Sequence, residues 1–276
     1  MRRFGVVMKP GVVEEAPGVH IGRTIGSDRL ILLDPFLLLD HMQVGDAAAS
    51  SIGFPRHPHR GIETLTWMVA GRVHHKDSQG SDDSVGAGEA QWMTAGKGIF
   101  HSEMLEQTAE GCEGLQLWFN LPATQKFIPA GYQAARKNDI PMVTSDGATV
   151  SLVAGTYQDT TGPLDRIAVQ PTVLGVTLSQ GASVTLPAPP GQNAFAYVHH
   201  GSVTDAQGKT VDAAQLAIFT DGENATITTT SPEGAALLFC AAKPLNEPVF
   251  LYRSLVLSNV DQMAQALDDL ENDTFA

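Results

Sequence analysis

Cysteine and positive charge are both scarce in this 276-residue chain. Only two cysteines occur, Cys112 and Cys240, and neither belongs to a Cys-x-x-Cys pair, so a disulfide framework is not expected and a reducing compartment is favoured. The 17 basic residues are outnumbered by 30 acidic ones, which gives a formal net charge of -13. Because such a field repels phosphate backbones and no basic run compensates for it, we expect no direct contact with nucleic acid.

Long hydrophobic runs are also missing. No stretch reaches the roughly 18 apolar residues of a membrane helix, and the N-terminal MRRFGVVMKPGVVEEAPG lacks the apolar core of a signal peptide. We therefore expect a cytoplasmic protein that does not enter membranes, and we expect it to be a monomer. The hydrophobic content of 43% is enough to bury one large β domain or two domains of about 140 residues.

Short segments separated by glycine and proline dominate the chain, which is typical of β-sandwiches and barrels. The predicted strands include ETLTWMV, GLQLWFNL, ATVSLVAG, PTVLGVTL and GAALLFCA. Helical spacing is clear only in SNVDQMAQALDDL, which predicts a C-terminal helix of about three turns, capped by Ser258 or Asn259 and packed on a sheet. The apolar residues at helical spacing in this segment are Val260, Met263, Ala264 and Leu267.

An internal repeat indicates two similar barrels in tandem. GIETLTWMVAGRV, which begins at Gly61, and GQNAFAYVHHGSV, which begins at Gly191, share glycine, aromatic and valine positions at a constant offset of 130 residues. The polar segment QDTTGPLDR lies between the two copies. We therefore predict an N-terminal domain over residues 1–158 and a C-terminal domain, including the helix, over residues 166–276.

Two pairs of side chains stand two residues apart, as metal ligands on a strand do. His57 and His59 in RHPHRG share one face of a strand because side chains alternate, and His101 and Glu103 in GIFHSEM do the same. If barrel strands bring the pairs together, three imidazoles and one carboxylate surround an ion. The other interpretation is that His57 and His59 are loop residues beside prolines and that His101 is an ordinary core residue.

The spacing between the pairs favours the metal site. HPHRGIE, then Gly71, then a G-x5-T-x-G-x4-H run ending at His101 follow the two-motif signature of cupins, which are double-stranded β-helix barrels. Such a ligand set suits one divalent ion, Fe(II), Mn, Co, Ni or Zn, with open positions for other ligands. Spacing leaves the carboxylate undecided, because Glu63 has the same strand parity as His59.

The stretches HPHRGIETLTWMVAGRVHHKDSQG and GEAQWMTAGKGIFHSEM resemble the core of the pirin family of bicupins. The resemblance continues through GLQLWFNLPA and GYQAARKNDIP and, more loosely, over nearly the whole chain. It implies an all-β fold of two cupin barrels, with iron bound in the first barrel by the positions of His57, His59, His101 and Glu103. Glu63 then has a supporting role, accepting a hydrogen bond from a ligand imidazole.

Other candidate residues receive simpler interpretations. Adding 130 to the residue numbers of the first histidine pair gives Pro187 and Pro189, so we expect the second barrel to be free of metal.

The neighbouring His74 and His75 face opposite sides of a strand, so the side chain of one of them can point into the cavity. Aromatic and methionine side chains in strand-like runs are expected in the core rather than at the site. They are Trp67, Trp92, Met93, Trp118 and Phe119.

The resemblance implies a dioxygenase similar to quercetin 2,3-dioxygenase. Such an enzyme takes a flavonol and O2, and Glu103 would act as the catalytic base that accepts the 3-hydroxyl proton. The same site can instead serve another small enolic or aromatic substrate. The alternative is a non-enzymatic redox-sensing protein, similar to pirins that act as transcription cofactors, whose metal oxidation state controls binding of a protein partner.

Overall fold

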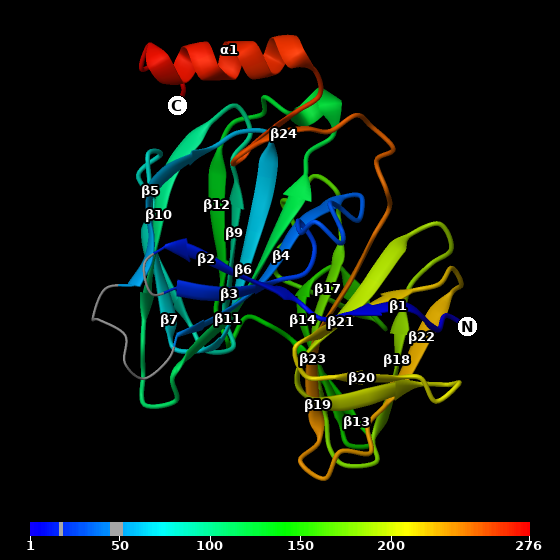
Figure 1. The fold of residues 1–276 in the computed structure, drawn as a ribbon. Coiled ribbons are helices and arrows are strands. Elements are labelled where there is room, and N and C mark those ends of the chain that lie inside the picture. The colour runs from blue at the N-terminus through cyan, green and yellow to red at the C-terminus, as the bar shows by residue number, and fades with distance from the viewer. Residues whose placement is uncertain (17–18, 45–51) are drawn as a thin grey trace. The chain divides into compact units, whose positions relative to one another are not determined.

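The computed structural model describes residues 1–16, 19–44 and 52–276, which form two compact units (Figure 1). We call the unit made of Val12–Lys137, Ile167–Val169 and Leu245–Ala276 the histidine barrel. We call the unit made of Met1–Gly11, Asn138–Arg166 and Gln170–Pro244 the apolar barrel.

Two sheets and a hairpin build the histidine barrel. Its elements are β2 (Gly11–Ala16), β3 (Val19–Arg23), β4 (Phe36–Val44), β5 (Ile52–His59), β6 (Ile62–Ala70), β7 (Arg72–Asp77), β8 (Asp82–Gly86), β9 (Ala90–Thr94), β10 (Ile99–Glu106), β11 (Cys112–Asn120), the 3-10 turn η1 (Ala123–Gln125), β12 (Gly131–Ala135), β24 (Phe250–Tyr252), β25 (Leu255–Leu257) and the helix α1 (Val260–Glu271). The larger sheet has the order β12-β9-β6-β11-β4-β3-β2, and the smaller has the order β5-β10-β7-β8. Strands β24 and β25 pair with each other.

The apolar barrel is built on one branched sheet. Its strands are β1 (Phe4–Met8), β13 (Met142–Ser145), β14 (Ala148–Ala154), β15 (Thr156–Tyr157), β16 (Thr160–Thr161), β17 (Thr172–Leu178), β18 (Ser183–Pro187), β19 (Asn193–Asp205), β20 (Thr210–Asp212), β21 (Gln215–Phe219), β22 (Asn224–Thr228) and β23 (Ala235–Ala242). The main path runs β1-β21-β19-β23-β17-β14-β13. Its interior is filled by apolar side chains such as Leu152, Leu174 and Phe239.

The strands predicted from alternating and β-branched segments are confirmed. They form β6, β11, β14, β17 and β23. Both copies of the internal repeat also share their backbone geometry. Gly61 and Gly191 have φ of 77° and 76°, and Gly71 and Gly201 have φ of 72° and 69°, so each repeat begins and turns at a left-handed glycine.

The C-terminal helix is confirmed, but of its predicted apolar residues only Met263 packs against the hairpin. The Asn259 side chain accepts a hydrogen bond from the Gln262 amide and caps the first turn. The face that packs consists of Met263, Ala266 and Leu270, which lie with Leu255, Leu257, Phe100 and Phe275, whereas Val260 and Leu267 are exposed. The helix is apolar on two sides, and its spacing alone does not decide which side meets the hairpin.

The two ends of the chain each belong to the barrel built mainly from the other end. Strand β1 pairs with β21 of the apolar barrel, and Leu245–Ala276, which contains α1, belongs to the histidine barrel. These units therefore differ from the predicted ranges of 1–158 and 166–276. Strand pairing over long sequence separations produces the difference, and a boundary read from local composition does not register it.

Both cysteines are buried and unpaired, as expected for core residues. Among the described residues, no helix is both long enough and apolar enough to cross a membrane.

Candidate metal centre

Strand β10 lies between β5 and β7 and brings three sequence segments together. His101 is opposite His57 on β5 and opposite Asp77 on β7. Glu103 is opposite His75 on β7. Each strand thus carries a pair of polar residues two positions apart, and strand alternation turns both members of a pair toward one face.

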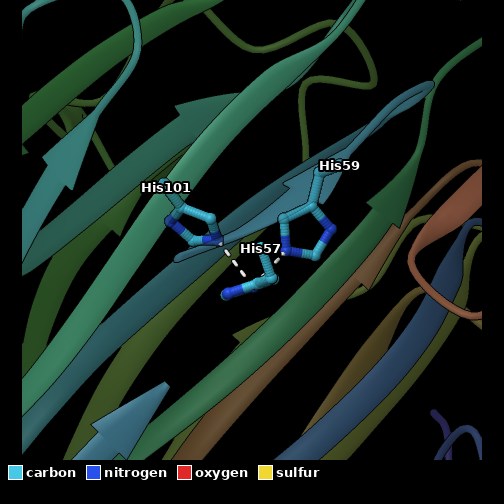
Figure 2. A group of neighbouring side chains, drawn as sticks. All are labelled: His57, His59 and His101. Carbon is cyan, nitrogen blue, oxygen red and sulfur yellow. Dashed lines mark hydrogen bonds between the residues drawn. The ribbon is translucent and has the colours of Figure 1, made fainter. Parts of the chain in front are cut away.

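The three predicted histidines meet through their Nε2 atoms (Figure 2). The Nε2 of His57 lies 3.0 Å from that of His59 and 3.0 Å from that of His101. Their ring centroids lie between 4.4 and 4.9 Å apart. His59 and His101 are buried, and His57 is half-buried.

The outer Nδ1 atoms of two of these rings face oxygen atoms that can only accept hydrogen bonds. The Nδ1 of His57 lies 2.8 Å from the Pro55 carbonyl oxygen, and the Nδ1 of His59 lies 3.3 Å from the Ser254 carbonyl oxygen. Both Nδ1 atoms must therefore carry the proton, and both Nε2 atoms are left with lone pairs. The third ring has its Nδ1 3.4 Å from the Nδ1 of His75.

The site therefore presents inward lone pairs that need a cation. Burial first, and then the neighbouring histidines, lower the pKa of His59 and of His101 well below 6.5, so neither holds an extra proton at neutral pH. Neutral imidazole nitrogens that converge in this way are the donor set that Fe, Mn, Co, Ni and Zn accept. The residues present fit a divalent metal ion.

Glu103 lies beside His101 in a nest of hydrogen-bond donors. Its Oε1 accepts from the Thr66 hydroxyl at 2.9 Å and from the Gln91 amide at 2.6 Å, and its Oε2 accepts from the Gln116 amide at 2.5 Å. Ligand atoms of His75, His101 and Glu103 all lie within 4.8 Å of one another, as do those of His57, His59 and His101. His101 belongs to both groups.

Glu63, the alternative carboxylate, faces other partners. Its Oε1 accepts from the Thr94 hydroxyl at 2.7 Å, and its Oε2 accepts from the Ala168 amide at 3.1 Å. Burial raises the pKa of Glu63, against the lowering effect of these hydrogen bonds. Within the described part of the chain, Glu63 joins neither histidine group, and the expected hydrogen bond to a ligand imidazole is not among its contacts.

Sequence reasoning noticed His75 but missed its partner. His75 is fully buried and faces the site, with its Nε2 2.9 Å from Asp77 Oδ2, whereas His74 points outward to Asp82. The signal was present, because His75 and Asp77 are a third pair at the same spacing of two. Thr66, Gln91, Gln116 and Ser254 were also missed, because they are polar residues without a spacing pattern that links them to the histidines.

The expected core aromatics include one that lies at the site. Trp92, Met93 and Phe119 are buried in the core, as predicted. The Trp118 ring instead meets the His59 ring edge-on, with centroids 5.0 Å apart. Its indole nitrogen is buried without a hydrogen-bond partner among the described residues.

Comparison with known proteins identifies the family. The family model for Pirin matches residues 18–119, and that for the Pirin C-terminal cupin domain matches residues 173–276. The chain belongs to the pirin family. The pirin-like protein of Caulobacter vibrioides is 38% identical over 98% of this chain and 97% of its own length. Human pirin is 34% identical over 94% of this chain and 88% of its own length.

A solved structure confirms the predicted architecture of two cupin barrels. Quercetin 2,3-dioxygenase from Acinetobacter baumannii superposes with a TM-score of 0.90 at 29% identity, covering 100% of this pirin and 99% of that chain. The fold class and the family expected from the histidine motifs are therefore both confirmed.

Proposed function

We propose that the histidine barrel binds one divalent metal ion and that the protein is a dioxygenase acting on a flavonol or a similar enolic aromatic compound. The observation that carries this proposal is the convergence of the Nε2 atoms of His57, His59 and His101, with protons held on the outer nitrogens of His57 and His59. Iron is our first assignment, and Mn, Co, Ni and Zn also suit three imidazoles and a carboxylate.

Glu103 is the proposed fourth ligand. A carboxylate offers about four acceptor positions, and donors from Thr66, Gln91 and Gln116 occupy three of them. The remaining acceptor position would hold the ion in the absence of substrate, and it would accept the substrate's proton once a substrate oxygen has replaced the carboxylate. The neighbouring position of Glu103 beside His101 supports it over Glu63, whose oxygens are bound to Thr94 and Ala168.

The chemistry divides between the ion and the side chains. When bound, the ion supplies Lewis-acid and one-electron chemistry. Glu103 takes the proton of the substrate's 3-hydroxyl group, because neutral imidazoles that are already committed as ligands provide no base. The unpaired indole N–H of Trp118 offers a donor to a substrate oxygen beside His59. O2 then adds across the ring and carbon monoxide is released.

The relatives support this reaction class. The Acinetobacter baumannii structure is that of a quercetin 2,3-dioxygenase, and it matches the whole length of this chain. The match covers the histidine barrel together with the apolar barrel, whose core is formed by apolar side chains. Both histidine groups found in the described residues belong to the histidine barrel. That the apolar barrel binds no metal stays a prediction.

Metal analysis tests the ligand assignment. We expect wild-type protein to bind one equivalent of metal, and we expect His101→Ala and Glu103→Ala to lose most of it. Glu63→Ala is the matched control, because it removes a buried carboxylate from the same barrel and should retain the ion. Unchanged metal content in Glu103→Ala would overturn the assignment of the fourth ligand.

Turnover tests the reaction. Protein loaded separately with Fe, Mn, Co or Ni is mixed with quercetin under anaerobic conditions and then exposed to air. We expect O2 uptake and CO release with at least one metal, and we expect Glu103→Gln to abolish both. Absence of CO with all four metals would refute flavonol cleavage, and a screen of other enolic aromatics would then decide between another substrate and no enzymatic role.

The second candidate function is non-enzymatic redox sensing. The observations that favour it are the similarity to human pirin and the net charge of -13, which suits a basic protein partner better than DNA. Its test compares the affinity of one basic protein partner for the ferrous and ferric forms. Equal affinities would exclude a redox switch.

Compartment and oligomeric state also stay predictions. Two buried, unpaired cysteines suit a reducing cytoplasm. Light scattering of the purified protein, with a mass near 29.3 kDa, would support the predicted monomer.

A further inference from the structure

Behind His101, on the side away from the metal position, lies a buried histidine–carboxylate pair. The Nδ1 of His75 is 3.4 Å from the Nδ1 of His101, and the Nε2 of His75 is 2.9 Å from Asp77 Oδ2. The side chains of His75 and Asp77 are both fully inaccessible to solvent. The other oxygen of Asp77 accepts from the backbone amides of Gln79 at 2.8 Å and Ser81 at 3.0 Å.

These contacts give each nitrogen in the row a definite role. Burial alone would raise the pKa of Asp77, but hydrogen bonds from His75, Ser81 and Gln79 outweigh burial and lower that pKa, so the carboxylate is ionised and can only accept. In the neutral imidazole of His75, the Nε2 donates to Asp77 and the Nδ1 is then the accepting nitrogen. The Nδ1 of His101 then donates to His75, and the Nε2 of His101 is left with a lone pair that points at His57.

We propose that His75 and Asp77 are positioning residues that fix the tautomer and ring orientation of His101. The proposal rests on the proposed metal site, because the consequence of fixing His101 is that its Nε2 is ready to bind the ion. The carbonyl oxygens of Pro55 and Ser254 fix the tautomers of His57 and His59 in the same way, by accepting from their Nδ1 atoms. Only His101 is held by a side-chain relay that ends in a charge, which makes its imidazole the most strongly polarised of the three.

A second metal ion held by His75, His101 and Glu103 is the competing interpretation, because their ligand atoms also lie close together. The existing hydrogen bonds argue against it. Asp77 fixes the tautomer of His75, and the accepting nitrogen of His75 is already used by His101. Metal stoichiometry separates the two interpretations.

The isosteric variant Asp77→Asn gives the sharpest test. The amides of Gln79 and Ser81 require an acceptor, so the asparagine oxygen accepts from them and its NH2 group donates to the Nε2 of His75. His75 is then forced to donate from Nδ1, and this proton meets the Nδ1 proton of His101. We expect His101 to switch its proton to Nε2 and the metal dissociation constant to rise roughly 10- to 100-fold.

Asp82→Asn is the matched control. Asp82 pairs with the Nε2 of His74 at 2.7 Å on the exposed side of the same hairpin, so it alters the same kind of pair outside the site. We expect its metal affinity to equal that of wild type. Two changes at His75 complete the set. His75→Gln retains an acceptor and a donor and should recover most of the affinity, whereas His75→Leu should lose roughly 10- to 100-fold.

The readouts are metal affinity and the imidazole tautomer of His101, measured by 15N NMR on the metal-free protein at neutral pH. We expect the proton on Nδ1 in wild type and on Nε2 in Asp77→Asn. An unchanged tautomer and an unchanged affinity in Asp77→Asn would overturn the proposal, as would a wild-type stoichiometry of two that falls to one in His75→Leu. If His75→Leu does not fold, Asp77→Asn still decides the question.

Failure of the metal site itself gives a different pattern. If wild-type protein binds no metal, the proposed function fails, yet the tautomer of His101 still reports whether the relay orients the ring. If wild-type protein binds one equivalent and Asp77→Asn binds it equally well with the same tautomer, the site stands and the positioning role fails.

Discussion

At the residue scale, the three inward-facing imidazoles differ in how far along the chain their outer partners lie. His57 is held by a carbonyl two residues away, His101 by His75 on the adjacent strand, and His59 by Ser254, 195 residues away. The inward arrangement is thus produced by local, neighbouring-strand and long-range contacts together. A substitution at any of these partners can disturb the ligand set without touching it.

Metal affinity should fall only gradually as the pH is lowered from 7.5 to 6. Metal binding to three histidines with ordinary pKa values would lose close to three log units of affinity per pH unit below about pH 6. Burial and repulsion from neighbouring histidines hold the pKa of His59 and of His101 well below 6.5. Protons therefore do not compete with the metal for the Nε2 atoms of His59 and His101 until the pH falls well below 6.5. We expect a slope of at most about one between pH 7.5 and pH 6. Competition with a chelator across this range measures it, and a slope near two or more would contradict the buried arrangement.

The sequence was sufficient to predict the three histidines, because alternation on strands is a local rule. It was not sufficient for Asp77, although its spacing from His75 matches that of the other pairs, because only strand pairing shows that β7 and β10 are neighbours. The role of Ser254 has no sequence signal at all, since a backbone carbonyl is present in every residue.

At the scale of elements, the start of β6 is locked to β25. A Cβ atom at Gly61 would overlap the Val256 carbonyl oxygen, and Lys126 donates to the carbonyl oxygens of both Gly61 and Val256, at 2.8 and 2.9 Å. This junction connects the strand after the histidine pair to the hairpin that carries Ser254.

Gly61→Ala tests the junction, and Gly191→Ala is its matched control. Both glycines have φ near 77°, so alanine costs about 1–2 kcal/mol of backbone strain at either position. Only Gly61 has a neighbour in the way, because a Cβ at Gly191 meets nothing within 4 Å. We expect Gly61→Ala to lose about 2 kcal/mol more than Gly191→Ala and to increase hydrogen exchange in β25. Equal losses in the two variants would show that the close approach is unimportant.

Lys126→Met should weaken the same junction from the other side. The Lys126 ammonium is buried and donates to Gly61, Val256 and the Asn120 side chain, so methionine removes a donor from three acceptors, of which the Gly61 oxygen keeps the Leu121 amide at 3.4 Å. We expect a loss of about 3 kcal/mol, seen as a lower thermal unfolding midpoint. The exposed Lys97→Met serves as the control and should change stability little. A Lys126→Met protein as stable as the control would contradict this role.

Element positions were predicted more reliably than element contacts. Capping and periodicity predicted about three turns of α1 with Ser258 or Asn259 as the cap, and the structure has Asn259. The buried face of α1 was not evident from the sequence. Arg60 of the barrel forms an ion pair with Asp269 at 2.6 Å, and this contact fixes which face of the helix is turned toward the barrel. That contact connects residues more than 200 positions apart.

At the scale of the whole molecule, each barrel borrows a segment from the far end of the chain. Strand β1 completes the apolar barrel, where the Arg2 guanidinium donates to the carbonyl oxygens of Ala188, Pro189 and Gln192. The segment after Leu245 completes the histidine barrel. The predicted pair of consecutive domains missed this exchange, because the repeat at an offset of 130 marks equivalent strands and not the ends of a unit.

Deleting either end should therefore disturb the distant barrel. Removal of residues 1–8 takes away β1 and Arg2, and we expect faster hydrogen exchange in β21 with metal content unchanged. Removal of residues 250–276 takes away Ser254 and α1, and we expect loss of metal with faster exchange in β5. Metal loss in the first deletion and retention in the second would contradict this assignment.

Because His59 depends on the carbonyl of Ser254, the histidine cluster can reach its final arrangement only after Ser254 has been synthesised. At roughly 5–20 residues per second, Ser254 is synthesised about 150 residues, or roughly 8–30 s, after β10. Until then His59 lacks the acceptor that holds its proton on the outer nitrogen. A nascent chain that has not yet reached Ser254 would carry the histidines without their final alignment, so we expect ion capture to wait until this segment has been synthesised.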